Sequence, residues 1–121
     1  MSEAEEYYNN GNNLSKQGDY KNAIIEFSKA IKINTEYWEA YRCRGSAKYN
    51  IGNDYGAIED YTKAIEIQSN DFVSYCFRGS AYAQLGEYDN AIKDLEKSLS
   101  IVPNFPIAMQ QLQQVRQVRG Y

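Results

Sequence analysis

The sequence predicts an all-α protein, a solenoid of stacked helix pairs closed by a seventh helix. Three observations predict it: residues of the same type recur every 34 positions, apolar residues follow the spacing of a helix face, and a glycine interrupts each unit. The 121 residues divide into three leading residues, three units of 34 and a tail of sixteen. This arithmetic assigns residues 1–121 to a single domain.

Six columns of matching residues show the 34-residue period. Two columns hold glycine, and the others hold alanine, tyrosine, a bulky aromatic or leucine side chain, and a small residue. They are Gly11, Gly45 and Gly79; Gly18, Gly52 and Gly86; Ala23, Ala57 and Ala91; Tyr7, Tyr41 and Tyr75; Phe27, Tyr61 and Leu95; and Ala30, Ala64 and Ser98. Chance does not produce six columns in one register, so they define repeats over residues 4–37, 38–71 and 72–105.

Each repeat is predicted to form two helices. The first ends at Gly18, Gly52 or Gly86, because glycine adopts the positive φ of a helix C-terminus without strain. Apolar residues of the second follow the 3.6-residue period. In the first repeat these are Ala23, Ile24, Phe27, Ala30, Ile31 and Ile33.

The small columns predict close helix crossings. A glycine inside a helix costs about 1 kcal/mol relative to alanine, so its recurrence at Gly11, Gly45 and Gly79 indicates that another helix crosses closely there. Two helices alone cannot bury both of their faces, so the repeats must stack.

The tail is predicted to form a capping helix over 106–119 that begins at Pro106 and shields the open end of the stack. Apolar residues of this helix are expected to face the stack, and polar ones to face water. The inward set is Ile107, Met109, Leu112 and Val115, and the outward set is Gln110, Gln113, Gln114 and Arg116.

Composition argues against several classes of function. The chain has no histidine, so it lacks the commonest general base and metal ligand. A net charge of −3 disfavours nucleic-acid binding. No apolar run approaches the roughly 18 residues of a membrane span, and the acidic start is not a secretory signal. We therefore expect a cytoplasmic protein with no cofactor, no metal, and no nucleic-acid or membrane partner.

No catalytic constellation is evident in the sequence. It contains no nucleophile–base pair, phosphate-binding loop or metal motif, so we expect no enzymatic activity. Cys43 and Cys76 are expected to be free thiols, because metal binding would need two further ligands and a disulfide between neighbouring helices is not favoured. A second repeated pattern of opposite charges predicts structural ion pairs. These are Arg44 with Asp60 and Arg78 with Asp94, whose places in the first repeat hold Asn10 and Glu26.

A 34-residue helix–turn–helix unit with these columns resembles the tetratricopeptide repeat family. The resemblance covers residues 4–105 and the capping helix, and it is most typical at 41–45, 75–79, 60–65 and 86–91. Two departures concern single residues. The usual proline between units occurs only as Pro103, and Lys48 stands in a column that is apolar at Leu14 and Tyr82.

The resemblance implies a right-handed superhelix whose first helices line a concave groove, in which family members mostly bind peptides or partner proteins. It therefore implies a protein–protein interaction module that binds a peptide or a partner helix, as a monomer or a weak homo-oligomer. The groove residues predicted by register are Tyr8, Asn12, Arg42, Cys43, Ser46, Tyr49, Val73, Cys76, Phe77 and Ser80.

The family's best-known site, a clamp for the C-terminal carboxylate of chaperones, is not expected here. That clamp consists of lysine, asparagine, asparagine, lysine and arginine. The corresponding positions are Tyr8, Asn12, Cys43, Val73 and Phe77, of which only Asn12 matches. A carboxylate that leaves water needs cationic or N–H donors, and among central positions only Arg42 is basic.

Two alternatives stay open at this point. The predicted groove residues could instead cover the edges of the core between first helices. The chain could also be a self-associating scaffold with no peptide ligand, using exposed Tyr37, Trp38 and Phe105 or the last helix.

Overall fold

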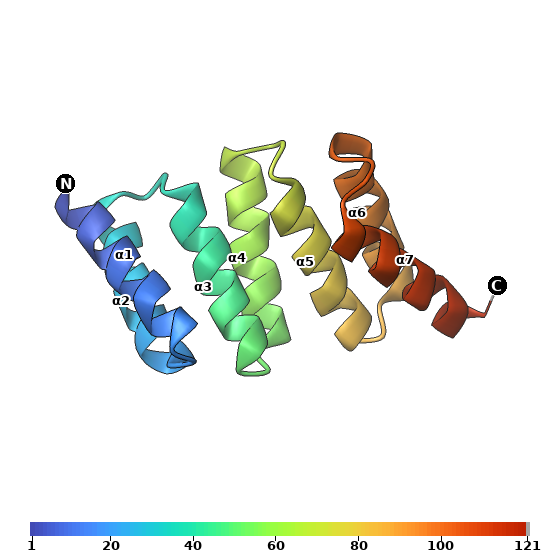
Figure 1. Ribbon diagram of the computed structural model, residues 1–121, viewed down its shortest axis with the longest axis horizontal. Helices are drawn as coiled ribbons and strands as arrows, with labels where there is room; N and C mark the ends of the chain where they lie inside the picture. Colours follow the sequence, from blue (N-terminus) through green and yellow to red (C-terminus); the bar gives the residue numbers. More distant parts are fainter. Residues whose placement is uncertain (121) are drawn as a thin grey trace.

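The computed structural model describes residues 1–120, which form seven helices and no strand. Figure 1 shows the helices side by side along the long axis, with the two ends of the chain at opposite ends of the row. The helices are α1 (Glu3–Lys16), α2 (Tyr20–Ile33), α3 (Trp38–Asn50), α4 (Asp54–Ile67), α5 (Phe72–Gln84), α6 (Tyr88–Ile101) and α7 (Pro106–Arg119).

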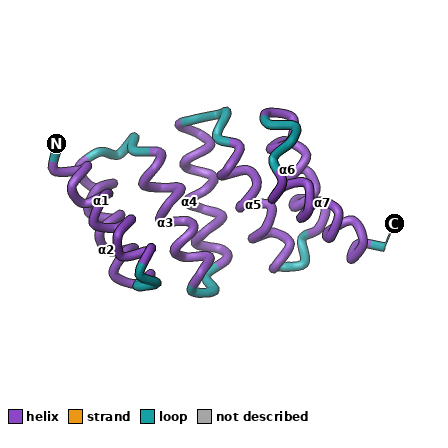
Figure 2. Tube along the Cα trace, in the orientation of Figure 1, coloured by secondary structure: helices purple, strands orange, loops and turns teal. Residues whose placement is uncertain are grey.

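Three helix pairs and a seventh helix confirm the predicted all-α solenoid. The pairs are α1 with α2, α3 with α4, and α5 with α6, and each packs against the next in the row. Short loops join the helices throughout (Figure 2). The repeat boundaries after residues 37, 71 and 105 stay predictions, and residue 121, the end of the predicted domain, lies outside the described residues. No helix within residues 1–120 combines the length and apolar character that crossing a membrane requires.

The helix ends follow local chemistry. Ser2 caps α1 in a reciprocal capping box with Glu5, each side chain bonding the other's backbone N–H. The first helices of the three repeats stop before Gly18, Gly52 and Gly86, whose φ angles of 80°, 84° and 76° lie in the left-handed region. The predicted glycine stops are therefore confirmed, and the reversal of the chain inside each repeat depends on them.

The core is built from the repeated columns. Phe27, Tyr61 and Leu95 are fully buried, each against the glycine of the preceding helix in its own repeat. A Cβ atom added to Gly11 would lie 2.6 Å from the Phe27 ring, closer than real Cβ atoms approach any neighbour. The predicted close crossing is thus confirmed, and it is tightest in the first repeat.

Replacing Gly11 by alanine is expected to lower the free energy of unfolding by about 1–3 kcal/mol, although alanine is the better helix former. The reason is that the added methyl group must displace the fully buried Phe27 ring. Asn13→Ala, at an exposed position of α1, is the matched control and should be neutral or slightly stabilising. Urea titration monitored by circular dichroism measures the stability of both variants. An unfolding midpoint of Gly11→Ala equal to that of the unaltered protein would contradict the close packing of Gly11 against Phe27.

Ion pairs at equivalent positions link helices within and between repeats. Arg44 bonds both carboxylate oxygens of Asp60, at 2.8 and 2.7 Å, and its third nitrogen donates to Ser28 of α2, in the preceding repeat. Arg78 repeats this arrangement with Asp94 and with Thr62 of α4. The predicted structural ion pairs are confirmed.

The capping helix α7 packs on α6 and α5 through a stripe that only partly matches the prediction. Leu112 and Val115 are buried as expected, but Ile107 and Met109 are 41% and 52% exposed, and the buried residue in that turn is Ala108. The buried spacing of four and then three residues is that of one helix face. Alanine fits because α7 lies close to Cys76, Ala91 and Leu95, with which it forms one core cluster.

Candidate functional site

The first helices of the repeats and α7 form one continuous face. Contacts join α1 to α3, α3 to α5, and α5 to α7, and in Figure 1 α1 and α7 lie in front of α2 and α6. We call this surface, made by α1, α3, α5 and α7, the inner face. Two pockets open on it, one of about 420 Å³ at the start of α1 and α3, and one of about 290 Å³ between the ends of α5 and α7.

The sequence-predicted site residues differ in how accessible they are. Eight of the ten are half-buried, and Cys76 and Ser80 are buried. The half-buried ones are Tyr8, Asn12, Arg42, Cys43, Ser46, Tyr49, Val73 and Phe77. Partly exposed side chains on one face can contact a ligand, whereas the fully buried Cys76 side chain cannot.

Tyr8 and Cys43 join α1 to α3 on the N-terminal side of the inner face. The Tyr8 hydroxyl and the Cys43 Sγ share a hydrogen bond of 3.7 Å, and the Tyr8 ring packs on Tyr37, with ring centres 5.0 Å apart. Burial raises the pKa of Tyr8 to about 12 and also raises the pKa of the Cys43 thiol. Both groups are therefore neutral near pH 7, and Cys43 is not an activated nucleophile.

Tyr61 of α4 is fully buried beneath the middle of the inner face, where it contacts residues of α3 and α5. The Tyr61 hydroxyl bonds the Ser46 hydroxyl at 2.8 Å, and the Phe77 ring stacks on the Tyr61 ring with centres 6.5 Å apart. Ser46 therefore contributes to packing within the second repeat and Phe77 to packing between the second and third repeats. Both interpretations of these residues, ligand contact and edge cover, are compatible with their half-buried state.

Arg42 already has an acidic partner within the chain. Its Nη1 lies 3.2 Å from Oδ1 of Asp71, whose side chain is 1% exposed, and its guanidinium lies over the Trp38 ring at 5.2 Å. Asp71 also caps α5 by accepting from the Ser74 backbone N–H and hydroxyl. The one central basic residue of the sequence analysis is therefore neutralised by Asp71, because releasing that buried carboxylate unpaired would be costly.

Cys76 belongs to the core and not to the ligand surface. Its side chain is completely buried, with 0% of its surface exposed, and it packs with Leu95 and Leu112. Burial raises the pKa of its thiol to about 11. Within residues 1–120, Cys43 and Cys76 are free cysteines, as expected, and we leave Cys76 out of the proposed ligand surface.

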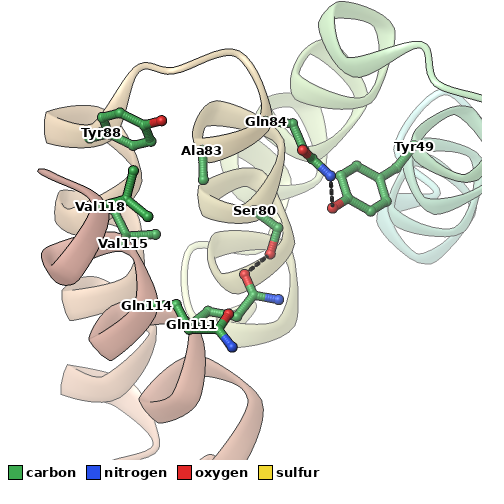
Figure 3. A pocket seen from close by; sticks show the side chains of 9 residues that line it. All are labelled: Tyr49, Ser80, Ala83, Gln84, Tyr88, Gln111, Gln114, Val115 and Val118. Carbon is green, nitrogen blue, oxygen red and sulfur yellow. Dashed lines mark hydrogen bonds between the residues drawn. The ribbon is translucent and has the colours of Figure 1, made fainter.

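The pocket between α5 and α7 contains residues that the sequence analysis missed. Tyr49 and Ser80 were predicted at the inner face, and both line it (Figure 3). The other lining residues are Ala83, Gln84, Tyr88, Gln111, Gln114, Val115 and Val118. A signal for them existed, because Gln111 and Gln114 lie 34 positions after Phe77 and Ser80, in the register of a fourth first helix.

Hydrogen bonds shape the polar half of this pocket. The Ser80 hydroxyl donates to the Gln111 side-chain oxygen, and the Gln84 amide donates to the Tyr49 hydroxyl at 3.4 Å. The first bond ties α5 to α7 and explains why Ser80 is only 4% exposed. Figure 3 shows the aliphatic side chains and the Tyr88 ring gathered on the opposite side of the pocket.

The pocket at the start of α1 and α3 has the opposite character. Glu5, Glu36 and Glu39 line it together with Tyr37 and Trp38, and no basic side chain does. Three carboxylates therefore line this corner of the inner face, next to the Arg42 guanidinium over Trp38, whereas the described lining of the α5–α7 corner carries no charge.

These features define a helical-repeat protein with a continuous first-helix face. Tetratricopeptide repeat models match residues 72–105 and 44–71, and a related TPR repeat model matches residues 11–52. The chain belongs to the tetratricopeptide repeat family. No curated protein is similar enough in sequence to count as a match.

Three solved structures illustrate the similarity. The first TPR of Spaghetti (RPAP3), bound to the HSP90 peptide SRMEEVD, is 26% identical, with a TM-score of 0.95 over 98% of this chain and 94% of that one. MamA is 30% identical, with a TM-score of 0.94 over 98% of this chain and 69% of that one. The second TPR domain of human RPAP3, in complex with the HSP70 peptide SGPTIEEVD, is 25% identical, with a TM-score of 0.88 over 91% and 92%. The fold is thus that of a general protein-interaction module.

Proposed function

We propose that this protein is an interaction module that binds a peptide or a partner helix on its inner face, and that it is not a chaperone-carboxylate clamp. The supporting surface comprises Tyr8, Asn12, Ser46, Tyr49, Val73 and Phe77, with the pocket between α5 and α7. We propose a protein partner and no nucleic-acid partner. The cytoplasmic location and the monomeric or weakly oligomeric state stay predictions.

The observation that supports this proposal most is the lack of free positive charge at the clamp positions. Two of the similar structures hold peptides ending in an acidic EEVD sequence. Here Tyr8 and Cys43 bond each other, Phe77 stacks on Tyr61, and the guanidinium of Arg42 is committed to Asp71. A carboxylate bound at this place would lose its hydration without gaining a charged donor.

Titration with fluorescently labelled SRMEEVD tests the proposal. We expect no saturation below about 1 mM, that is, binding weaker than about 4 kcal/mol. The positive control rebuilds the missing charges in one chain with Tyr8→Lys, Cys43→Asn, Val73→Lys and Phe77→Arg, while Asn12 is kept. That variant, if circular dichroism shows a folded helical protein, should bind the peptide at least tenfold more tightly. Micromolar binding by the unaltered protein would refute the exclusion of clamp chemistry.

Self-association is the second candidate, and exposed apolar residues on α7 favour it. Met109 and Val118 are 52% and 65% exposed, and Val118 also lines the pocket between α5 and α7. The earlier candidates Tyr37, Trp38 and Phe105 are half-buried, and Phe105 packs edge-on against Phe72 at 5.1 Å. Light scattering of the protein alone distinguishes the candidates, because only self-association predicts a mass that rises with concentration.

A further inference from the structure

Among residues 1–120, no charged side chain lines the pocket between α5 and α7. Its apolar half consists of Ala83, Val115 and Val118 with the Tyr88 ring, and its other half consists of amides and hydroxyls (Figure 3). The pocket is open, since Gln84, Gln114 and Val118 are exposed, but a charged group that packs against its lining gives up part of its hydration and meets no opposite charge there. The chemistry of the lining therefore favours an uncharged occupant.

The glutamines of this pocket have hydrogen-bonding capacity left over. Gln111 uses its oxygen to accept from Ser80, so its two N–H groups are available, and Gln84 uses one N–H toward Tyr49, so its oxygen is available. In the part of the chain that the structure describes, no hydrogen bond involves the side chain of Gln114. Donors and acceptors side by side match the N–H and C=O groups of a peptide backbone.

The two pockets occupy diagonally opposite corners of the inner face. Gln84 and Val118 lie in the last turns of α5 and α7, whereas Glu5 and Glu39 lie in the first turns of α1 and α3. A chain crossing the inner face between these corners meets Glu5, Glu36 and Glu39 at one end only. A ligand with complementary charge therefore carries positive charge where it meets α1 and α3 and no charge where it meets α5 and α7.

We infer that the partner is an extended peptide segment, uncharged where it meets α5 and α7 and containing lysine or arginine where it meets α1 and α3. This inference rests on the proposed function, because it names the chemical class of the segment bound by the same face. An apolar side chain of the segment sits against Val115, Val118 and Tyr88, while its backbone bonds the glutamine amides. A bound acidic C-terminus, as in the EEVD peptides, would have the wrong charge for both corners.

Selection from a phage library tests the inference. The probe is a library of random peptides of about twelve residues, displayed without a free C-terminus, which span up to about 40 Å when extended. The selected pool should be depleted of aspartate and glutamate, and lysine or arginine should cluster toward one end with uncharged apolar residues toward the other. A pool enriched in acidic residues would overturn the inference while leaving the proposed peptide binding intact.

Two neighbouring glutamines provide matched variants for the affinity measurement. Both residues are exposed, but only Gln114 lines the pocket, so Gln114→Glu places a negative charge at its wall and Gln113→Glu makes the same change outside it. Because the tightest peptide should insert an uncharged part there, Gln114→Glu should weaken its binding about tenfold and Gln113→Glu should leave it unchanged. Equal affinities would overturn the assignment of the pocket.

Nuclear magnetic resonance adds a readout that depends on location. Adding the selected peptide should shift the side-chain amide signals of Gln84, Gln111 and Gln114. Shifts confined to α2, α4 and α6 would overturn the inference and the inner-face proposal together. Failure of the library to yield any peptide above background would overturn the proposed function itself. A dimer of the protein alone that Gln114→Glu dissociates would identify a second copy as the occupant and would also overturn the inference.

Discussion

Replacing Asp60 by alanine is expected to lower the free energy of unfolding by about 3–5 kcal/mol, because a buried ion pair loses one partner and leaves the other charged. The Asp60 side chain is 4% exposed and contacts two cations, Arg44 at 2.7 Å and Lys48 at 3.1 Å. Its hydrogen bonds also raise the pKa of the Arg44 guanidinium, because they stabilise the charged form. Urea unfolding followed by circular dichroism measures the loss.

The third repeat supplies the control for this experiment. Asp94 binds Arg78 through the same two carboxylate oxygens, but within residues 1–120 no lysine forms an ion pair with it. Asp94→Ala should therefore be destabilising by a smaller amount, since one cation and not two is left behind. Adding Lys48→Met to Asp60→Ala should restore part of the lost stability. Losses below 1 kcal/mol in both aspartate variants would contradict a structural role for these pairs.

Replacing Tyr61 by alanine is expected to cost about 3–5 kcal/mol, the range for deleting a large buried aromatic side chain. Tyr61 is the largest fully buried side chain, it packs on Gly45, and its hydroxyl bonds Ser46. Its removal would leave a cavity between the helices of the second repeat and would also remove the stacking surface of Phe77.

Two further tyrosine variants separate packing from hydrogen bonding. Tyr61→Phe keeps the ring and loses only the bond to Ser46, so a cost of about 1 kcal/mol is expected. Tyr55→Ala, at a side chain that is 69% exposed, should change stability by no more than about 0.5 kcal/mol. Thermal or urea unfolding ranks the three variants by stability. A Tyr61→Ala protein as stable as Tyr55→Ala would show that the column of Phe27, Tyr61 and Leu95 does not form the core.

Lys48 shows why a departure from the repeat pattern could not be interpreted from the sequence. Its column is apolar in the other repeats, at Leu14 and Tyr82, so the lysine looked like a local irregularity. In the structure its ammonium group lies 3.1 Å from Asp60. The sequence places Lys48 and Asp60 on different helices, and only their packing brings the charges together.

Arg42 and Cys76 illustrate the same limit at the candidate site. Register placed both on the groove side, yet Arg42 is paired with Asp71, which is 29 residues away, and Cys76 is covered by α7. Register gives the direction of a side chain relative to its own helix. It does not report which neighbouring helix reaches that side chain, or with what group.

The sequence by itself determined the helices, their ends and the repeated ion pairs, because these depend on residues within one 34-residue unit. Glycines that end helices, apolar periodicity and small residues at helix crossings all act locally. Because each recurs every 34 residues, these features could be recognised in the sequence. Only the tertiary structure decided how the inner face ends. The rotation of α7 about its axis relative to α5 and α6 buries Ala108 instead of Met109, brings Gln111 to Ser80 and places Gln114 in the pocket lining. That rotation depends on contacts between helices that follow no repeat, which is why the uncharged pocket emerged from packing alone.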